Sequence, residues 1–413
     1  MMKKFLLKPI NLYFVAVILG LLNGFYGNEN LHHVAELISN MFIRMFRSLG
    51  APIIAVSLIT ILSSFSDTEI STTGKRTITY TIVTTIVAGL VSMMVYLLIH
   101  PQISNASSTL AASVVSQNTS YLKHIANIIP SNFFSPFIEN QVISILFIGI
   151  VIGFAIRLIP DPETKKTVVL FFKGIQSILF TLTKWVVTIL PIGIFAFVSI
   201  SVAQYENGFK IESLGQYFTV ILLANLIQGF VILPVWLKYK GIKPFRSMKQ
   251  MMPALSVAFF SKSSTGTLPL TIEIAEKRLG LQTSVTRFVL PLCTTINMNG
   301  CAAFIFTTVI YVMQSNGIDI SIGTMLLWVF VATIAAIGNA GVPMGCYFLS
   351  ASLLSSMKIP IELLGLILPF YSVIDMVETS LNVWSDSCVA NVINKEMTQS
   401  QPLLVNNDVT IEC

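Results

Sequence analysis

The chain has 413 residues, of which 54% are hydrophobic and 11% are charged, and its mean hydropathy is +0.79. A soluble domain carries about 25% charged residues, so this composition excludes a soluble globular protein and predicts an integral membrane protein. The net charge of +6 lies in short clusters between apolar segments, so we expect no nucleic-acid partner.

Six apolar segments in the first 240 residues approach or exceed the length of about 20 residues that a membrane-spanning helix needs. They are 10–26, 51–65, 78–99, 143–159, 168–203 and 217–237. The first lacks a small-residue cleavage site, so we expect it to be a retained helix and not a signal peptide. Basic clusters near Lys75, Lys165 and Lys240 predict cytoplasmic loops, and the polar loop 104–140 an external one. The chain is therefore expected in the cell membrane, with both termini cytoplasmic, and the pattern fits a bacterial inner membrane.

The segment 251–275 is too interrupted to form one clean helix. Pro253 and the polar run from Ser261 to Pro269 cut it in two. Non-helical backbone at membrane depth is tolerated only where it is buried in protein or lines a cavity. We therefore predict two half-helices that meet at a serine-rich tip. A plain polar loop is the alternative, and it would leave Phe259 and Phe260 in water.

Two later apolar segments carry similar interruptions. Asn297, Asn299 and Gly300 lie in the middle of 286–313, which suggests local unwinding that frees backbone carbonyls as Na⁺ ligands. The segment 322–356 is broken at Gly-Asn-Ala-Gly-Val-Pro-Met-Gly, residues 338–345. Paired hydrophobic segments interrupted by Gly or Pro indicate the binding site of a secondary transporter.

The last apolar run, 359–393, contains an acidic helix face. On an α-helix the five polar residues fall within roughly 100° of arc; they are Asp375, Glu378, Thr379, Asn382 and Asp386. A carboxylate at membrane depth costs at least about 2.5 kcal/mol, so three of them predict a site for a cation or a cationic group. Hydrogen bonding between helices is the alternative for the Thr and Asn side chains.

The five cysteines show no C-x-x-C pair, which argues against a metal site or a disulfide framework; they are Cys293, Cys301, Cys346, Cys388 and Cys413. No His, Cys or Ser forms a recognisable base and nucleophile set, so we do not expect an enzyme. A channel is a further alternative, and saturable uptake driven by an ion gradient would exclude it.

These motifs together resemble the dicarboxylate/amino acid:cation symporter family, which has the glutamate-transporter fold. The serine-rich tip, Asn-Met-x-Gly, Gly-x-Ala-Gly-Val-Pro and Asp-x-x-x-Thr-x-x-Asn-x-x-x-Asp follow in the family's order between residues 256 and 395. The resemblance implies an all-α multi-pass membrane protein of eight transmembrane helices and two re-entrant hairpins with inverted repeats. It also implies a homotrimer in lipid that moves its amino acid substrate by an elevator mechanism.

The domain boundaries that the resemblance implies divide the chain near residue 240. Residues 1–240 would be mainly scaffold and trimerisation helices, with the third and sixth transmembrane helices joining the transport domain. Residues 241–396 would form the transport core, with hairpin 1, the seventh transmembrane helix, hairpin 2 and the eighth transmembrane helix. Residues 397–413 would be a cytoplasmic tail.

The resemblance also assigns roles to positions. Asp375 would hold the substrate ammonium and Asn382 its α-carboxylate. The other substrate-binding positions would be Ser263, Ser264, Thr265, Cys301, Val342, Pro343, Gly345, Glu378 and Thr379. One Na⁺ would bind Asp386, Asn297, Asn382 and a carbonyl near Cys293. A second would bind carbonyls near Thr295, Met298, Ala336, Ile337 and Asn339.

Glu378 departs from the family pattern, because relatives that carry aspartate or glutamate have an arginine there. A second carboxylate disfavours an acidic substrate, and a glutamate here resembles the sodium/serine-threonine branch. We therefore predict symport of a small neutral amino acid (serine, threonine or alanine-like) with Na⁺, or possible H⁺ coupling in its place. The alternative is an acidic amino acid or C4-dicarboxylate symporter. Glu378 could pair with Lys262, bind the substrate's hydroxyl or side-chain cation, or carry a coupling proton.

A third ion site of the family has also changed here. Thr84 and Thr85 align with its hydroxyl ligands, while Asn299 stands where acidic relatives carry an aspartate. We therefore expect weak or absent Na⁺ binding at this place and a lower ion stoichiometry.

Overall fold

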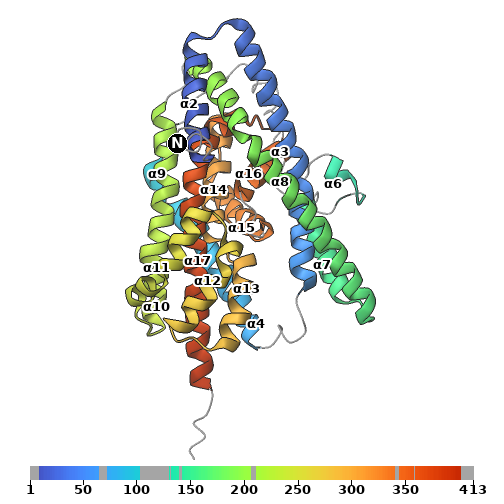
Figure 1. The fold of residues 1–413 in the computed structure, drawn as a ribbon, viewed down its shortest axis with the longest axis vertical. Helices are drawn as coiled ribbons and strands as arrows, with labels where there is room; N and C mark the ends of the chain where they lie inside the picture. Colours follow the sequence, from blue (N-terminus) through green and yellow to red (C-terminus); the bar gives the residue numbers. More distant parts are fainter. Residues whose placement is uncertain are drawn as a thin grey trace, which may run out of the picture.

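The computed structural model describes residues 9–64, 72–102, 130, 132–138, 142–205, 211–339, 344–357 and 359–400, and every regular element within these ranges is a helix (Figure 1). The predicted all-helical class is confirmed. Five described stretches are long and apolar enough to cross a membrane; they are Thr73–Ile99, Pro162–Val186, Ser213–Tyr239, Thr283–Ser315 and Leu363–Gln399. These lengths and compositions are those of an integral membrane protein.

The described residues up to Tyr205 form the helices α2 (Pro9–Tyr26), α3 (Glu29–Ser64), α4 (Thr72–Ile99), α6 (Ser135–Ile138), α7 (Val142–Arg157) and α8 (Pro162–Tyr205). The five apolar segments predicted here each fall on one of the longer helices. The helix α3 is longer than its apolar segment and continues through Pro52. Hydropathy located only its second half, because residues 29–50 are more polar.

The second part begins with a continuous helical rod and then breaks repeatedly. The rod is α9 (Ile211–Ile227), the π-helical segment η3 (Gln228–Ile232) and α10 (Leu233–Tyr239). The remaining helices are α11 (Pro244–Ser261), α12 (Ser264–Lys277), α13 (Thr283–Ile296), α14 (Asn299–Ser315), α15 (Ile322–Gly338), α16 (Gly345–Ser356) and α17 (Glu362–Ser400).

The three predicted interruptions are all present, but prolines do not make the first one. Pro253 and Pro269 lie inside α11 and α12. The break falls at Lys262, which has the left-handed conformation (φ 54°, ψ 34°). The break therefore lies within the predicted polar run from Ser261 to Pro269, and only the prediction that Pro253 cuts the segment was wrong. The chain turns where the left-handed Lys262 ends α11 and Ser263 caps α12. Asn297 and Met298 separate α13 from α14, as the amide and glycine pattern predicted.

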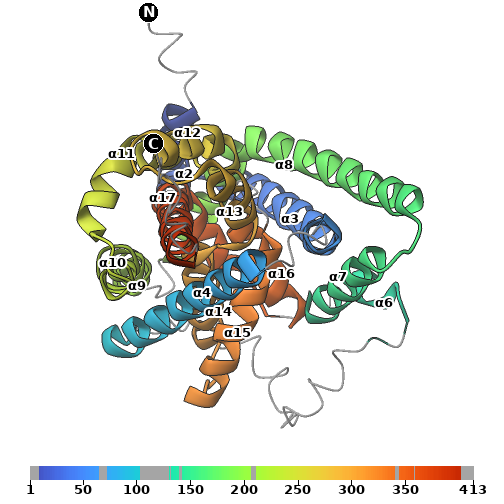
Figure 2. The same ribbon diagram turned by 90° about the horizontal axis from the view of Figure 1, so that it is seen from below.

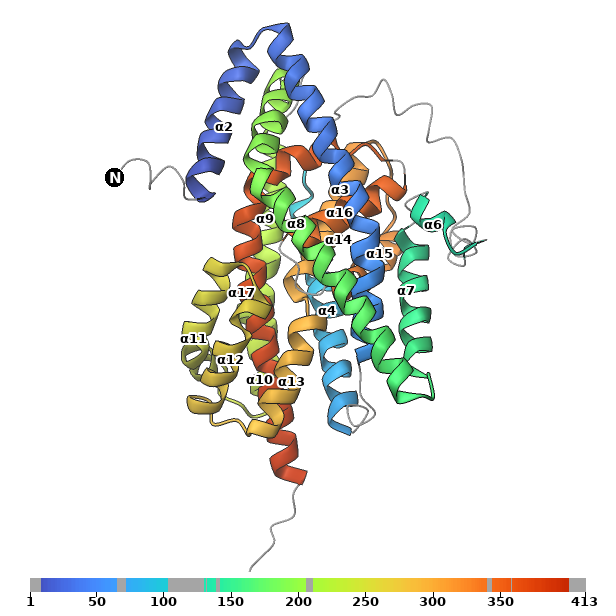
Figure 3. The ribbon, with the colours of Figure 1, turned by 45° about the vertical axis from the view of Figure 1, so that its right-hand side comes forward.

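Helix α14 is the centre of the molecule, and almost all of its residues are buried. Figure 2 shows α3, α7 and α8 together on one side, where α3 packs against the other two. Figure 3 shows α11, α12 and α13 gathered around the lower part of α17, which they contact. Asn297 and Met298, between α13 and α14, are buried, and so are Asn339 and Met344, the described residues next to the ends of α15 and α16.

A cluster of charged and polar side chains joins α4, α17 and the end of α10 at one end of the bundle. Lys240 Nζ lies 2.7 Å from Glu396 Oε1, and the Tyr80 hydroxyl donates to the same oxygen at 2.7 Å. The hydrogen bond to Glu396 holds the pKa of Lys240 above its ordinary value. Lys395 Nζ donates to the carbonyls of Lys240 and Gly241 at 2.8 and 2.9 Å, which fixes the end of α10 against α17.

Candidate substrate and ion site

The polar face of α17 is buried in the bundle. Glu378 and Asp386 are 1% exposed, and Asp375 and Asn382 are 7% and 5% exposed. Thr379 is buried as well, but its hydroxyl donates to the Asp375 carbonyl of its own helix at 2.7 Å. The helical spacing therefore predicted correctly which residues share one face. Three carboxyl groups on that face have almost no access to solvent.

Two of these carboxyl groups lack partners for some of their oxygens. Both oxygens of Glu378 and Oδ2 of Asp375 are buried without a hydrogen bond. A buried charge without a partner costs several kcal/mol, so such groups normally bind something. Asp375 and Glu378 lie one helical turn apart on α17. The pair is the strongest candidate in the described chain for a site that receives a positively charged or proton-donating ligand.

Asp386 differs from these two residues because both of its carboxylate oxygens accept hydrogen bonds from protein side chains. Asn297 Nδ2 donates to Asp386 Oδ1 at 2.9 Å, and the Thr294 hydroxyl donates to Oδ2 at 3.3 Å. Asn297 comes from the interruption between α13 and α14, so the break supplies a side chain to α17. The structure thus brings together two of the residues predicted to share one Na⁺. The Asp386 carboxylate and the Thr294 hydroxyl supply oxygens of the kind that a hard cation binds, while the Asn297 amide nitrogen donates to the carboxylate.

The first tip contacts α17 through Lys262. Lys262 Nζ donates to the Ser372 hydroxyl at 3.0 Å, three residues before Asp375. The suggested ion pair between Lys262 and Glu378 is not formed. The Lys262 ammonium group donates to the Ser372 hydroxyl, and neither oxygen of Glu378 accepts a hydrogen bond. Ser263 caps its own helix by accepting from the Gly266 N–H at 3.0 Å, while Ser264 is buried and Thr265 is exposed.

The second tip lies at the start of α16. Val342 and Pro343, which were predicted to bind substrate, lie outside the described residues. Met344 is left-handed (φ 60°), and Gly345 follows it as the first residue of α16. A Cβ atom on Gly345 would overlap the Asn339 side chain, so any larger residue here would displace the Asn339 amide. Asn339 Nδ2 donates to the sulfurs of Cys301 and Cys346 at 3.3 and 3.4 Å.

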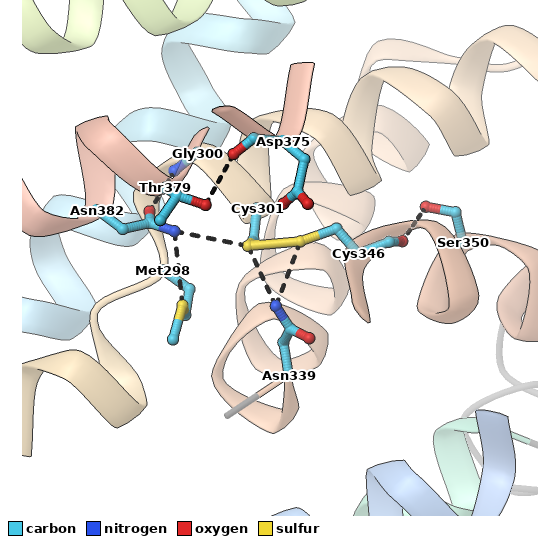
Figure 4. The surroundings of a disulfide bond; sticks show 9 residues. All are labelled: Met298, Gly300, Cys301, Asn339, Cys346, Ser350, Asp375, Thr379 and Asn382. Carbon is cyan, nitrogen blue, oxygen red and sulfur yellow. Dashed lines mark hydrogen bonds between the residues drawn. A yellow bond between two sulfur atoms is a disulfide. The ribbon is translucent and has the colours of Figure 1, made fainter. Parts of the chain in front are cut away.

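Cys301 and Cys346 form a disulfide that joins α14 to α16 (Figure 4). The expectation that the cysteines form no disulfide was wrong. The two residues are 45 positions apart in the sequence, and their Cα atoms are brought to 5.5 Å by the packing of α16 against α14. No local motif could have shown this pairing, whereas Cys293 and Cys388 are buried and free.

Asn382 connects α17 to the start of α14. Its Oδ1 accepts from the Gly300 N–H at 2.9 Å, and its Nδ2 donates to the Met298 and Cys301 sulfurs at 3.6 and 3.7 Å. A Cβ atom on Gly300 would lie 2.7 Å from Glu378 Cα, so this glycine permits the close contact of the two helices. The unwound segment is therefore held directly against the acidic face.

Most of the backbone carbonyls predicted as Na⁺ ligands occur in the same neighbourhood. Those of Cys293, Met298 and Ala336 each accept one backbone N–H, at 2.7, 3.0 and 3.0 Å. A carbonyl oxygen has a second lone pair, so these contacts leave room for a cation. The Thr295 hydroxyl donates to the Leu292 carbonyl at 2.7 Å, and Ile337 packs against the cluster of Leu292 and Ile296. The end of α15 and the break after α13 are therefore adjacent.

A network of amides occupies the place of the predicted third ion site. Asn299 Nδ2 donates to Asn297 Oδ1 at 2.8 Å, to Ser385 at 2.9 Å and to Thr84 at 3.4 Å. Gln228 Nε2 donates to Asn299 Oδ1 at 2.7 Å. The Thr85 hydroxyl instead donates to the Thr81 carbonyl of its own helix at 2.7 Å. The sequence interpretation missed Gln228, although an amide within the apolar segment 217–237 is a signal that could have identified it.

Apolar helices that break around a buried acidic face define a membrane transport protein with an internal site for ions and a small solute. The profile of the sodium:dicarboxylate symporter family matches residues 10–396, and the chain belongs to this family. The protein is thus a cation-coupled symporter of the amino acid transport class.

The names of similar proteins indicate different substrates. The chain is 27% identical over 394 residues to the proton/sodium-glutamate symport protein of Bacillus subtilis, covering 92% of this chain and 91% of that protein. It is 28% identical over 280 residues to the neutral amino acid transporter B(0) of Mus musculus, covering 66% of this chain and 50% of that protein. A putative sodium-dependent excitatory amino acid transporter of Caenorhabditis elegans is 32% identical over 257 residues, covering 62% of this chain and 51% of that protein.

Proposed function

We propose that the protein takes up a small neutral amino acid, with serine, threonine, alanine and cysteine as candidates, in symport with Na⁺. Glu378 is the observation that carries this proposal. Its carboxyl group is 1% exposed, both of its oxygens lack a partner, and it lies one turn from Asp375. A substrate with a side-chain carboxylate would place a third acidic group here, whereas a neutral substrate would not.

In this proposal Asp375 binds the substrate ammonium and Asn382 the α-carboxylate. Glu378 accepts a hydrogen bond from a side-chain hydroxyl of serine or threonine. Two other roles for Glu378 give different substrates or ions: it could receive the side-chain cation of lysine or ornithine, or it could carry a coupling proton. Met344 and the two cysteines are buried beside this position, and they favour a small side chain.

The proposed ion coupling uses two Na⁺ and not three. Asp386 and Asn297 belong to one site, and the carbonyls around Met298 and Ala336 belong to the other. At the third place the amide nitrogen of Asn299 points at Asn297, Ser385 and Thr84, so a donor stands where a cation needs an oxygen. Gln228 holds the Asn299 oxygen and keeps the amide in this orientation.

The proposed architecture is that of eight transmembrane helices and two re-entrant hairpins, α11–α12 and α15–α16, in a homotrimer embedded in lipid. Residues 1–240 would contribute mainly the scaffold, and residues 241–396 would carry the substrate across as an elevator. The proposal places both termini in the cytoplasm and assigns no enzymatic reaction. The packing of α11, α12 and α13 around α17, and the separate packing of α7 and α8 on α3, support this division (Figure 2).

An acidic amino acid symporter is the second candidate. The glutamate symporter of Bacillus subtilis matches nearly the whole length of the chain. Lys262 Nζ, at Ser372, is the cation that could reach an acidic substrate from the first tip. This candidate requires Glu378 to be protonated or neutralised when the substrate binds.

Uptake of labelled serine into proteoliposomes tests the proposal. An inward Na⁺ gradient should drive accumulation above the external concentration. An equal K⁺ gradient should not drive accumulation, and neither should Na⁺ at the same concentration on both sides of the membrane. Saturable accumulation would also exclude a channel. The proposal fails if a Na⁺ gradient drives no uptake of serine, threonine, alanine or cysteine while aspartate accumulates.

A further inference from the structure

The disulfide between Cys301 and Cys346 lies within the proposed substrate site. Cys301 is the third residue of α14, directly after the glycine that contacts Glu378, and Cys346 is the second residue of α16. Both sulfurs accept from Asn339, and the Cys301 sulfur also accepts from Asn382 (Figure 4). The cross-link is therefore surrounded by side chains predicted to bind substrate and ions.

A substrate can reach this site only if helices move apart. Asp375, Glu378, Asn382 and Cys346 are all less than a tenth exposed. They belong to α16 and α17, two of the helices that pack against α14. Helix α16 has 12 residues, against 17 in α14 and 39 in α17. Helix α16 packs on α14 about as extensively as α17 does, but it makes few contacts with α17, so displacement of α16 away from α17 opens the acidic side of the site with little loss of packing between these two helices.

The disulfide opposes this displacement. It connects the first turn of α16 to the first turn of α14, with the Cα atoms 5.5 Å apart. A hydrogen bond or an apolar contact can exchange with water during opening, but a covalent bond cannot. While the bond is present, the second tip stays against the unwound segment.

We infer that Cys301 and Cys346 form a reversible oxidation site that locks the transporter closed. This inference rests on the proposed transport function, because it requires opening at this site. In the dithiol state α16 can separate from α14 and transport proceeds. In the disulfide state the site stays occluded and transport stops.

Thiol–disulfide exchange with a low-molecular-weight disulfide supplies the chemistry. When the tip is open, the Cys346 thiolate attacks the external disulfide, which gives a mixed disulfide and releases one external thiol. The Cys301 thiolate then attacks the Cys346 sulfur and releases the second external thiol. The protein pair loses two electrons and two protons, and the external disulfide is reduced to two thiols. Excess dithiothreitol reverses the reaction.

The test compares the same full-length protein after incubation with excess glutathione disulfide or with dithiothreitol. Na⁺-driven serine uptake should be at least about tenfold lower after oxidation, and dithiothreitol should restore it. Peptide mapping without reduction measures the cross-linked fraction in the same samples. The Cys346→Ser variant should show equal uptake after both treatments. The Cys388→Ser variant is the matched control, because Cys388 is buried and free, and it should respond as the wild type does.

The peptide map separates failure of this inference from failure of the proposed function. Full uptake by protein whose map shows complete cross-linking would overturn the lock, as would the absence of any cross-link after oxidation. Reduced protein that takes up none of the candidate amino acids, although its cross-link forms and breaks, would overturn the proposed substrate class. A redox response that persists in Cys346→Ser would assign the effect to another residue and overturn the inference.

Discussion

Asp375 and Glu378 share a buried site, and one substrate ammonium can neutralise only one of them. Asp375 lies three residues after Ser372, the hydrogen-bond partner of Lys262. Glu378 instead lies against Gly300 of α14. This asymmetry separates their proposed roles. Asp375 contributes affinity for any amino acid, and Glu378 selects among side chains.

Replacing Asp375 with Asn should abolish uptake. Removal of one partner of a buried ion pair costs about 3–5 kcal/mol, which corresponds to a loss of affinity of at least about 100-fold. Uptake at a range of serine concentrations measures the change. Ser372→Ala, which alters a neighbouring α17 side chain bonded only to Lys262, is the control for damage to this helix. Full transport by Asp375→Asn would refute the ammonium role.

Replacing Glu378 with Gln should weaken discrimination against acidic substrates. Two unit charges 4 Å apart repel by about 4 kcal/mol at an effective dielectric constant of 20, so removal of one charge should improve inhibition by aspartate by at least about tenfold. The concentration of aspartate that halves serine uptake gives the result. An unchanged value for aspartate would show that Glu378 carries no charge when the substrate binds or that it does not face the substrate side chain.

At the scale of the elements, the close contact of α14 and α17 depends on Gly300. An alanine Cβ would meet Glu378 Cα at 2.7 Å and Cβ at 2.9 Å, and backbone atoms cannot move aside as a flexible side chain can. Gly300→Ala should therefore destabilise the protein by about 1–3 kcal/mol and reduce uptake. Thermal unfolding in detergent measures the first effect.

Gly174→Ala provides the matched control, because a Cβ at this exposed position of α8 meets nothing within 4 Å. It should be neutral or should stabilise the helix by up to about 1 kcal/mol. Equal melting temperatures for the two variants would contradict the close packing of α14 on α17.

The element boundaries were predictable where they depend on local pattern. The apolar runs, the interruption at Asn297 and the acidic face follow from hydropathy, helix-breaking residues and a 3.6-residue period. The break within the polar run from Ser261 to Pro269 was predictable, but its exact position at the left-handed Lys262 was not, and both Pro253 and Pro269 lie inside helices. The Cys301–Cys346 bond and the Gln228–Asn299 contact were hidden because they join residues distant in the sequence, and only tertiary packing brings them together.

At the scale of the whole molecule, the proposed ion coupling makes the amide network around Asn299 the feature that limits how many Na⁺ move with each substrate. At the position of the third ion site, the side chains are neutral and hydrogen-bond to one another; they are Asn299, Asn297, Gln228 and Ser385. Two Na⁺ per substrate give a weaker driving force for accumulation than three. In this proposal the number of Na⁺ per substrate, a property of the whole transport cycle, depends on the side chain at position 299.

The reversal potential of serine transport at varied Na⁺ gradients should give two Na⁺ per substrate. Asn299→Asp should raise this number, because the new carboxylate supplies the charge and the oxygen that the third place lacks. Asn316→Asp is a suitable control, since Asn316 ends α14 away from this network. Three Na⁺ per substrate in the wild type would contradict the account of the third site.

Competition against Na⁺-driven serine uptake by unlabelled threonine, alanine, aspartate and lysine tests the central claim most directly. The claim is that Glu378 makes this a site for neutral amino acids. Threonine and alanine should inhibit at concentrations similar to that of serine itself, while aspartate should need at least about a tenfold higher concentration. Inhibition by aspartate at the same concentration as threonine would contradict the claim and would favour Lys262 as the group that binds an acidic side chain.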